Sequence, residues 1–287
     1  MIIKQKTKEK QIVSSIALIK GKDSIDFNGN FYMYPNQYLS WNTLFDLLGE
    51  PRIHTQVSEV LTKEFGYFAI CDGLTAYHGS EYASYLLATQ LEEMLSESLE
   101  DLNFGLKDIK SMIGTMNQML CTYKNENPVI GDMAASIANL WISPTQMYAV
   151  NVGSTRIFRY ESGKLHSLVH PQLKNSIGSP CFIDYTNSPK LNPMYSYMGL
   201  DKTMGDLVID TCEISLDNPK EWFLLINSGV LDVMTIEDIE KILPIYYKQN
   251  EPMIAARTIL ESISNKEVVS RDLICMIVAI NQEEGAC

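Results

Sequence analysis

The amino-acid sequence predicts an α+β fold built in layers, and three observations support this prediction. Short runs rich in Val, Ile, Tyr and Phe, bounded by Gly, Pro, Ser or Asn, recur along the chain as β-strands do. Longer stretches with apolar residues at helical spacing separate these runs. The order is strands, a pair of helices, more strands and then late helices. Such segregation favours a layered α+β fold over a parallel βαβ fold.

The strands are expected where the apolar runs are short and bounded by turn residues. These runs are residues 12–19, 30–34, 66–71, 134–142, 146–152, 156–160, 164–169, 207–214, 222–226 and 273–280. Residues 145–168 look like a three-stranded meander, with turns at Val152-Gly153-Ser154 and Glu161-Ser162-Gly163.

Helices are expected at residues 80–99 and 106–123, from Thr235 onward, and across residues 253–263. Ser80 and Thr235 are residue types that cap helix N-termini.

Residues 35–60 carry Trp41, Leu44, Phe45 and Leu47 at helical spacing, which favours a core helix over an insertion near the functional site. Residues 172–198 are rich in Asn, Ser and Pro and indicate a long surface excursion. With no obvious linker, we expect a single domain over residues 1–287.

Composition narrows the function classes. The 287 residues carry a formal net charge of -12, which argues against binding to nucleic acid or anionic membrane, because both need a basic surface. The charge fits cations or basic segments of a partner, or solubility alone. No unbroken apolar run of about 18 residues predicts a membrane span. The six cysteines form no CxxC pair, and several lie in apolar runs, so we expect a reducing compartment, the cytoplasm.

One apolar run ends in an unusual way. Residues 67–71 read as a buried strand, yet Asp72 and Gly73 follow directly and a predicted helix begins soon after. Asp-Gly is an ordinary turn pair. A carboxylate at the end of a core strand is also a place for a metal ligand, and the choice depends on what other residues reach the same point.

Several colinear motifs resemble the metal-dependent protein phosphatases of the protein phosphatase 2C type. DGLTAYHGSEYAS has the length of the family's DGMGGHxGGExAS, although His78 lies one position later than the family's histidine. GDMA, YAVNVGSTRIFRYESGKL, YMGL, WFLLINSGVLDVM and SRDLICMIV follow in the order in which the family has its corresponding motifs. The resemblance covers the chain from about Ile12 to Ile280.

This resemblance implies a four-layer αββα sandwich, in which two mainly antiparallel sheets are flanked by helix pairs, with a metal site at one end. It implies that Asp72 and Asp272 are the catalytic carboxylates. Mn²⁺ or Mg²⁺ would be held by Asp72, the carbonyl of Gly73, Asp272 and, near the N-terminus, Asp23, because such hard ions take oxygen ligands. Asp272 could also be a surface carboxylate, and Asp23 an ordinary loop acid.

Departures from the family pattern put part of the site in doubt. The family's SDG has become Asn227-Ser228-Gly229, so Ser228 replaces an aspartate that ligates the second metal. Ser154 replaces another aspartate, in GDSR. A neutral hydroxyl cannot offset a dication, so we expect one tight metal site and a second that is weak or absent.

Four further residues have weaker expectations. Asp132 could compensate with a carboxylate, although Gly-Asp is also a common turn pair. The family's phosphate-binding arginine has no clear counterpart; Lys20 is nearby but cannot make the bidentate contact of an arginine. We expect Arg156 to be structural, and Asp232 to cap the helix that starts near Thr235.

The resemblance supports two hypotheses of different kinds. In the first, the protein is a phosphoserine/phosphothreonine phosphatase that uses a metal-activated water, with reduced activity, acting on phosphoproteins in signalling. In the second, it is an inactive pseudophosphatase, a regulatory module that binds a phosphoprotein or another partner.

Overall fold

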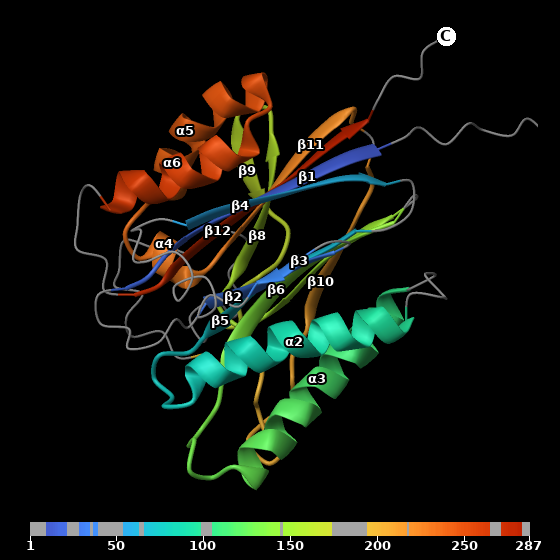
Figure 1. The fold of residues 1–287 in the computed structure, drawn as a ribbon, viewed down its shortest axis with the longest axis vertical. Coiled ribbons are helices and arrows are strands. Elements are labelled where there is room, and N and C mark those ends of the chain that lie inside the picture. Colours follow the sequence, from blue (N-terminus) through green and yellow to red (C-terminus); the bar gives the residue numbers. More distant parts are fainter. Residues whose placement is uncertain are drawn as a thin grey trace, which may run out of the picture.

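The fold is that of a sandwich whose two sheets lie face to face between two layers of helices (Figure 1). The computed structural model describes residues 10–21, 29–34, 37–39, 54–62, 66–98, 105–143, 146–173, 194–216, 218–264 and 271–282. Every strand pairing within these residues is antiparallel, and the layers are helix, sheet, sheet, helix. The predicted αββα architecture is confirmed.

Sheet A brings together the two ends of the described chain. Its strand order is β4-β1-β12-β11-β8-β9. The strands are β1 (Lys10–Ile19), β4 (His54–Thr62), β8 (Arg156–Glu161), β9 (Lys164–Ser167), β11 (Lys220–Ile226) and β12 (Leu273–Gln282). β12 is inserted between β1 and β11, and its register places Leu273 opposite Ile19.

Sheet B is built mostly from the middle of the chain, in the order β10-β7-β6-β5-β2-β3. Its strands are β2 (Gly29–Tyr34), β3 (Gln37–Leu39), β5 (Gly66–Gly73), β6 (Ala135–Ile142), β7 (Met147–Val152) and β10 (Asp210–Ile214). β5 and β6 are fully buried at the centre, because a helix layer covers one face and sheet A covers the other.

Two helix pairs close the sandwich. The helices α2 (Ser80–Ser98) and α3 (Leu106–Glu126) cover sheet B, whereas α5 (Ile236–Gln249) and α6 (Pro252–Ser264) cover sheet A (Figure 1). A single-turn helix, α4 (Ser228–Leu231), follows β11. Within the described residues, no helix is both long enough and apolar enough to cross a membrane.

The core is divided by the two sheets. One cluster fills the space between them and includes Phe68, Ile70, Leu225 and Ile274. A second cluster joins sheet B to α2 and α3, and a third joins sheet A to α5 and α6. Alternate residues of each central strand therefore belong to different clusters, as the twofold period of a β-strand requires.

Three expectations about elements need correction. The predicted meander is wrong, because β7 pairs within sheet B whereas β8 and β9 belong to sheet A. The turn at Gly153 carries the chain from one sheet to the other, and Gly153 has a φ of 100°, which favours glycine. Asp232 lies at the C-terminus of α4, and the cap of α5 is Thr235, which accepts a hydrogen bond from Asp238 N.

The third correction concerns residues 35–60. Their described parts are strands, β3 and most of β4, and β4 pairs with β1 at the edge of sheet A. The four residues at helical spacing, and most of the excursion expected at 172–198, lie outside the described residues.

Candidate functional site

On the inner face of each sheet, a row of apolar side chains stops at a polar side chain. On β5, Phe68 and Ile70 pack between the sheets, and Asp72 is the next residue of that alternation. Asp272 stands in the same relation to Ile274 at the start of β12. Strand alternation therefore directs both carboxylates toward the space between the sheets.

The side chain of Asn227 shows that these two strand ends meet. Its Nδ2 donates to Asp72 Oδ1 at 3.0 Å and to the backbone oxygen of Asp272 at 2.8 Å. Asp272 is held from another side, because Gly21 N donates to its Oδ1 at 2.6 Å. Residues from β1, β5, β11 and β12, or directly beyond their ends, thus converge at one end of the sandwich.

Asp72 lies in an environment that disfavours its charge. It is 8% exposed, and Asp272 is 3% exposed. Burial is the main cause that raises the pKa of Asp72 to about 7 from the usual 3.8, and the carboxylates of Asp272 and Asp232 add to the increase. The Asn227 hydrogen bond and the charge of Arg271 act in the opposite direction. A nearby positive charge stabilises a carboxylate whose charged form is disfavoured by burial and by other carboxylates.

The segment after Asp72 is fixed by close backbone contacts. Leu74 N donates to Ala134 O at 2.9 Å, and Gly79 N donates to Asp132 O at 3.0 Å. A Cβ on Gly73 would lie 2.3 Å from the backbone oxygen of Ser80, so only glycine fits where α2 begins. The Asp-Gly pair thus ends a core strand and positions a helix.

Ser154 reaches the same end of sheet B through Ser136. Ser136 is opposite Asp72 in the β5–β6 register, and register partners in an antiparallel pair share a face. Ser136 Oγ accepts a hydrogen bond from Ser154 N at 2.9 Å and lies 3.2 Å from Ser154 Oγ. Where the family has a carboxylate, this chain therefore has two neighbouring hydroxyls.

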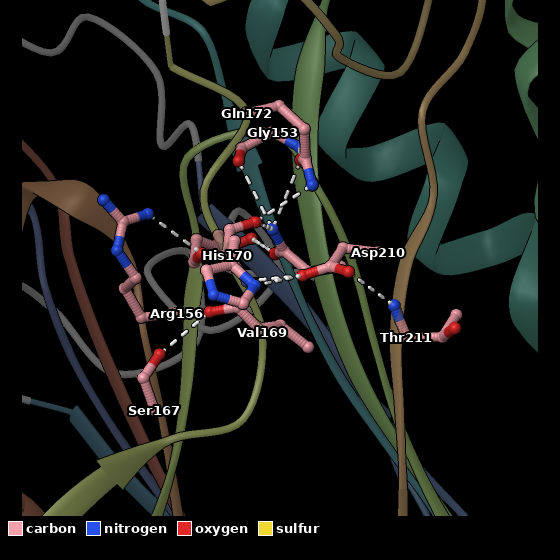
Figure 2. Close-up of polar contacts among 10 residues, drawn as sticks. Gly153, Arg156, Ser167, Val169, His170, Gln172, Asp210 and Thr211 are labelled. Atoms are coloured by element: carbon pink, nitrogen blue, oxygen red, sulfur yellow. Dashed lines mark hydrogen bonds and ion pairs between the residues drawn. The ribbon is translucent and has the colours of Figure 1, made fainter. Parts of the chain in front are cut away.

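A polar network that runs from the buried Gln172 to the exposed His170 holds the turn that carries Ser154. Figure 2 shows the side chain of Gln172 beside the Gly153 backbone, whose N–H donates to Gln172 Oε1. Gln172 Nε2 also donates to His170 O at 3.0 Å, and the His170 ring nitrogen Nδ1 lies 3.2 Å from Asp210 Oδ2. The network ties the crossing between the sheets to β10.

Two arginines of β8 have structural contacts. Arg156 is 2% exposed and donates from Nη1 to the carbonyls of Ser154 and Thr155, which stabilises the same turn. Arg159 makes a two-point ion pair with Glu221, from Nε to Oε2 at 2.9 Å and from Nη2 to Oε1 at 2.5 Å. These contacts agree with the expected structural role of Arg156.

The remaining predicted residues differ in position. Asp23 lies outside the described residues. Lys20 directly follows β1, next to Gly21, which contacts Asp272. The Asp132 side chain is 73% exposed with Lys124 Nζ 3.9 Å away, which gives no support to Asp132 as a replacement ligand. His78 is exposed.

Asn227 is the residue of the site that the motif comparison missed. The motif marks it only as a replacement for the serine of SDG, yet it contacts both candidate carboxylate segments. Its position could have been inferred from β11, where Phe223 and Leu225 face the inter-sheet core and residue 227 continues the alternation.

Among the described cysteines, Cys71 is next to this site in the sequence but is not placed as a nucleophile. Cys71 precedes Asp72 but packs on the opposite face of β5, in the cluster beneath α2. Burial and the neighbouring Asp72 charge raise the pKa of its thiol, whereas a cysteine nucleophile needs the thiolate.

The oxygen donors of the site are of the kind that a hard divalent cation takes. Asp72 and Asp272 offer carboxylates and Gly73 a carbonyl, which are the ligands that Mg²⁺ and Mn²⁺ prefer. The raised pKa of Asp72 agrees with such a site, because a bound cation favours the charged carboxylate that burial disfavours. Within the residues that the structure describes, however, no three His, Cys, Asp or Glu side chains gather into a metal-binding group.

No protein-family model and no curated protein sequence matches the chain. Solved structures do. The serine/threonine phosphatase Stp1 from Staphylococcus aureus has a TM-score of 0.70 at 16% identity, covering 95% of each chain. The serine/threonine phosphatase PstP/Ppp from Mycobacterium tuberculosis has a TM-score of 0.66 at 14% identity, covering 95% of this chain and all of that one (100%).

A third similar structure is the PPM Ser-Thr phosphatase MsPP from Mycobacterium smegmatis in complex with cacodylate. Its TM-score is 0.64 at 12% identity, and the match covers 94% of this chain and 98% of that one. The fold of the chain is thus that of the PPM-type, or protein phosphatase 2C-like, enzymes, and the resemblance seen in the sequence motifs is confirmed at the level of the fold.

Proposed function

We propose that this protein is a metal-dependent phosphatase of phosphoserine and phosphothreonine in proteins, a phosphoric monoester hydrolase of reduced activity. The observation that carries the proposal is the meeting of Asp72 and Asp272 at one end of the sandwich, joined through Asn227. The likeness to solved serine/threonine phosphatases across nearly the whole chain supports it.

The cofactor would be Mn²⁺ or Mg²⁺, held by Asp72, the Gly73 carbonyl and Asp272, with Asp23 as the proposed N-terminal ligand. When bound, such an ion supplies a water of lowered pKa and neutralises charge on phosphoryl oxygens. Asp72 and Asp272 contribute the negative charge that attracts the ion. The hydrogen bond from Gly21 N to Asp272 Oδ1, at 2.6 Å, keeps that carboxylate oriented.

Substrate phosphate needs a cation from the protein, and Lys20 is our candidate. It follows β1 at the end where Gly21 contacts Asp272. Its ammonium group would contact a phosphate oxygen as a point charge, without the two parallel hydrogen bonds that an arginine makes. Weaker substrate binding than in arginine-bearing relatives follows from this difference.

Reduced activity follows from the neutral groups around the carboxylates. Ser154 and Ser228 stand where the family has aspartates, and Ser154 contacts the Ser136 hydroxyl and the Arg156 guanidinium. Each missing carboxylate weakens a second cation by a few kcal/mol at a dielectric typical of protein surfaces. A second ion would therefore bind weakly or not at all.

The same observation favours a second candidate, a pseudophosphatase that binds a phosphoprotein or a regulatory partner without turnover. In either case we propose a cytoplasmic role in signalling. The thiols of Cys71 and Cys275 are free and buried in the core, which fits a reducing compartment. The net charge of -12 opposes nucleic acid and membrane surfaces as partners.

Hydrolysis of a small aryl phosphate, p-nitrophenyl phosphate, distinguishes the two candidates. We expect release of p-nitrophenol that requires Mn²⁺, stops with EDTA and falls about 100-fold or more in Asp72→Ala. Asp132→Ala is the matched control, because this exposed carboxylate faces Lys124, and its rate should equal that of the wild type. Equal rates for Asp72→Ala and wild type would reject the phosphatase and leave the binding module.

A further inference from the structure

The side chain of Asn227 uses its whole amide group inside the candidate site. It is 2% exposed. Nδ2 donates to Asp72 Oδ1 at 3.0 Å and to Asp272 O at 2.8 Å, while Oδ1 accepts from Ile274 N at 3.1 Å. Both amide hydrogens and the amide oxygen are therefore engaged, one hydrogen with the end of β5 and the other two groups with the start of β12.

The orientation of this amide is determined by its partners. Ile274 N can only donate, so it requires the oxygen of Asn227, and Asp272 O can only accept, so it requires the nitrogen. A flipped amide would lose both hydrogen bonds. The nitrogen must consequently be the atom that faces Asp72 Oδ1.

Close packing leaves the amide little freedom to move aside. Asn227 precedes α4, and its backbone N–H donates to Ile274 O at 3.3 Å. A Cβ on Gly229 would lie 2.8 Å from Asp272 O and 3.4 Å from Asn227 Nδ2. The first turn of α4 thus packs directly against the carbonyl that receives the amide hydrogen.

We propose that the Asn227 amide occupies the position beside Asp72 Oδ1 that a second divalent cation would need. The amide N–H hydrogen places a partial positive charge there, so Oδ1 is satisfied by a fixed hydrogen-bond donor. A second cation cannot bind until the amide is removed, even if a carboxylate replaces Ser228. Asn227 is then a positioning residue that holds Asp72 and Asp272 at a set spacing. This inference rests on the proposed metal-dependent function and refines it.

The wild-type protein provides the first test. In a ¹⁵N-correlated NMR spectrum, the side-chain amide of Asn227, assigned by its loss in Asn227→Ser, should exchange slowly with solvent. It should keep its slow exchange and both proton signals when Mg²⁺ is added to saturation. Loss of protection or collapse of the two signals on adding Mg²⁺ would show that the ion displaces the amide, and the inference would be wrong.

Counting bound Mn²⁺ by calorimetry and electron paramagnetic resonance provides the second test. Asn227→Ser/Ser228→Asp removes the amide and restores a carboxylate, and it should bind one more Mn²⁺ per chain than the wild type. Ser228→Asp alone should bind the same number as the wild type. A gain of one ion in Ser228→Asp alone, or no gain in the double variant, would overturn the inference.

Ser143→Asp is the control for added charge. Ser143 follows β6 at the end of sheet B opposite to Asp72, because Ile142 pairs with Gly66 and Ser136 with Asp72. This variant should leave the Mn²⁺ count unchanged. The difference in the number of bound Mn²⁺ between the double variant and the wild type tests the role of Asn227. Failure of the wild type to bind any Mn²⁺ or to release p-nitrophenol would count against the proposed function alone.

Discussion

Gly73 and Ser80 approach so closely that a single added methyl group at residue 73 would lie 2.3 Å from the Ser80 backbone oxygen and 2.7 Å from its carbonyl carbon. Both contacts are with backbone at the start of α2, so no side-chain rotation can relieve them. Gly73 is also the residue next to Asp72, and its own carbonyl is a proposed ligand. The packing of α2 and the geometry of the site therefore depend on the same glycine.

Gly73→Ala should lower the free energy of unfolding by about 3 kcal/mol or more, because overpacking here must move a helix. Gly114→Ala is the matched control. Gly114 lies in α3 with nothing within 4 Å of an added Cβ, and its replacement should stabilise the protein by about 0.5–1 kcal/mol. Urea denaturation of both variants measures the difference, and equal effects would contradict the close approach at Gly73.

The raised pKa of Asp72 predicts a pH-dependent stability in metal-free protein. The folded state holds the proton up to about pH 7, whereas the unfolded chain releases it near 3.8. The free energy of unfolding therefore loses up to ~4 kcal/mol as pH rises from about 4 to about 7. Asp72→Asn removes this loss, so in EDTA it should be more stable than the wild type at pH 8 and nearly equal at pH 4.5.

Urea titrations at several pH values measure this trend, with Asp201→Asn as the control. Asp201 Oδ1 accepts hydrogen bonds from Thr203 N at 2.8 Å and Thr203 Oγ1 at 2.7 Å, which lower its pKa. The effect of Asp201→Asn on the free energy of unfolding should therefore be constant from pH 4.5 to 8. If the difference in the free energy of unfolding between the wild type and Asp72→Asn does not change over this pH range, Asp72 is ionised throughout it.

The ion pair between Arg159 and Glu221 predicts a strong coupling within sheet A. Glu221 is 1% exposed, so Arg159→Met leaves a buried charge without its partner and should cost about 3–5 kcal/mol. Adding Glu221→Leu should recover most of that loss. Arg257→Met, which breaks the exposed pair with Glu261, should cost only about 0.3–0.5 kcal/mol. Additive effects of Arg159→Met and Glu221→Leu in a double-mutant cycle would refute the coupling.

The place of Lys20 predicts a gain of function. Lys20→Arg should lower the KM for p-nitrophenyl phosphate several-fold with little change in kcat, because a guanidinium can bind two phosphate oxygens at once. Lys20→Met should raise the KM. Steady-state kinetics in Mn²⁺ checks both, and a KM that is unaffected in both variants would remove Lys20 from the substrate site.

The layers of the fold could be predicted from the sequence because they rest on local patterns. The apolar runs before Asp72 and after Asp272 and the cap at Thr235 each encode their element directly. Sheet membership is not local. β7 and β8 both have the residue pattern of a strand, but the sequence of residues 145–168 does not indicate that the two strands belong to different sheets on either side of Gly153.

The site could be predicted in part for a related reason. Asp72 and Asp272 stand at strand ends in motifs, whereas the role of Asn227 depends on contacts with segments 155 and 45 positions away in the chain. β4 was missed because its sequence, HTQVSEVLT, mixes polar and apolar residues, as an edge strand does. The position of Asp23 stays a prediction.

The insertion of β12 between β1 and β11 has a consequence for biosynthesis. On a ribosome, β12 is made after every other described strand of sheet A, so β1 must wait for a neighbour that pairs Lys10 with Gln282. Such distant pairing slows folding. Asp272 directly precedes that late strand, so a nascent chain acquires its second carboxylate, and with it any capacity for chemistry, only after the other described strands have been made.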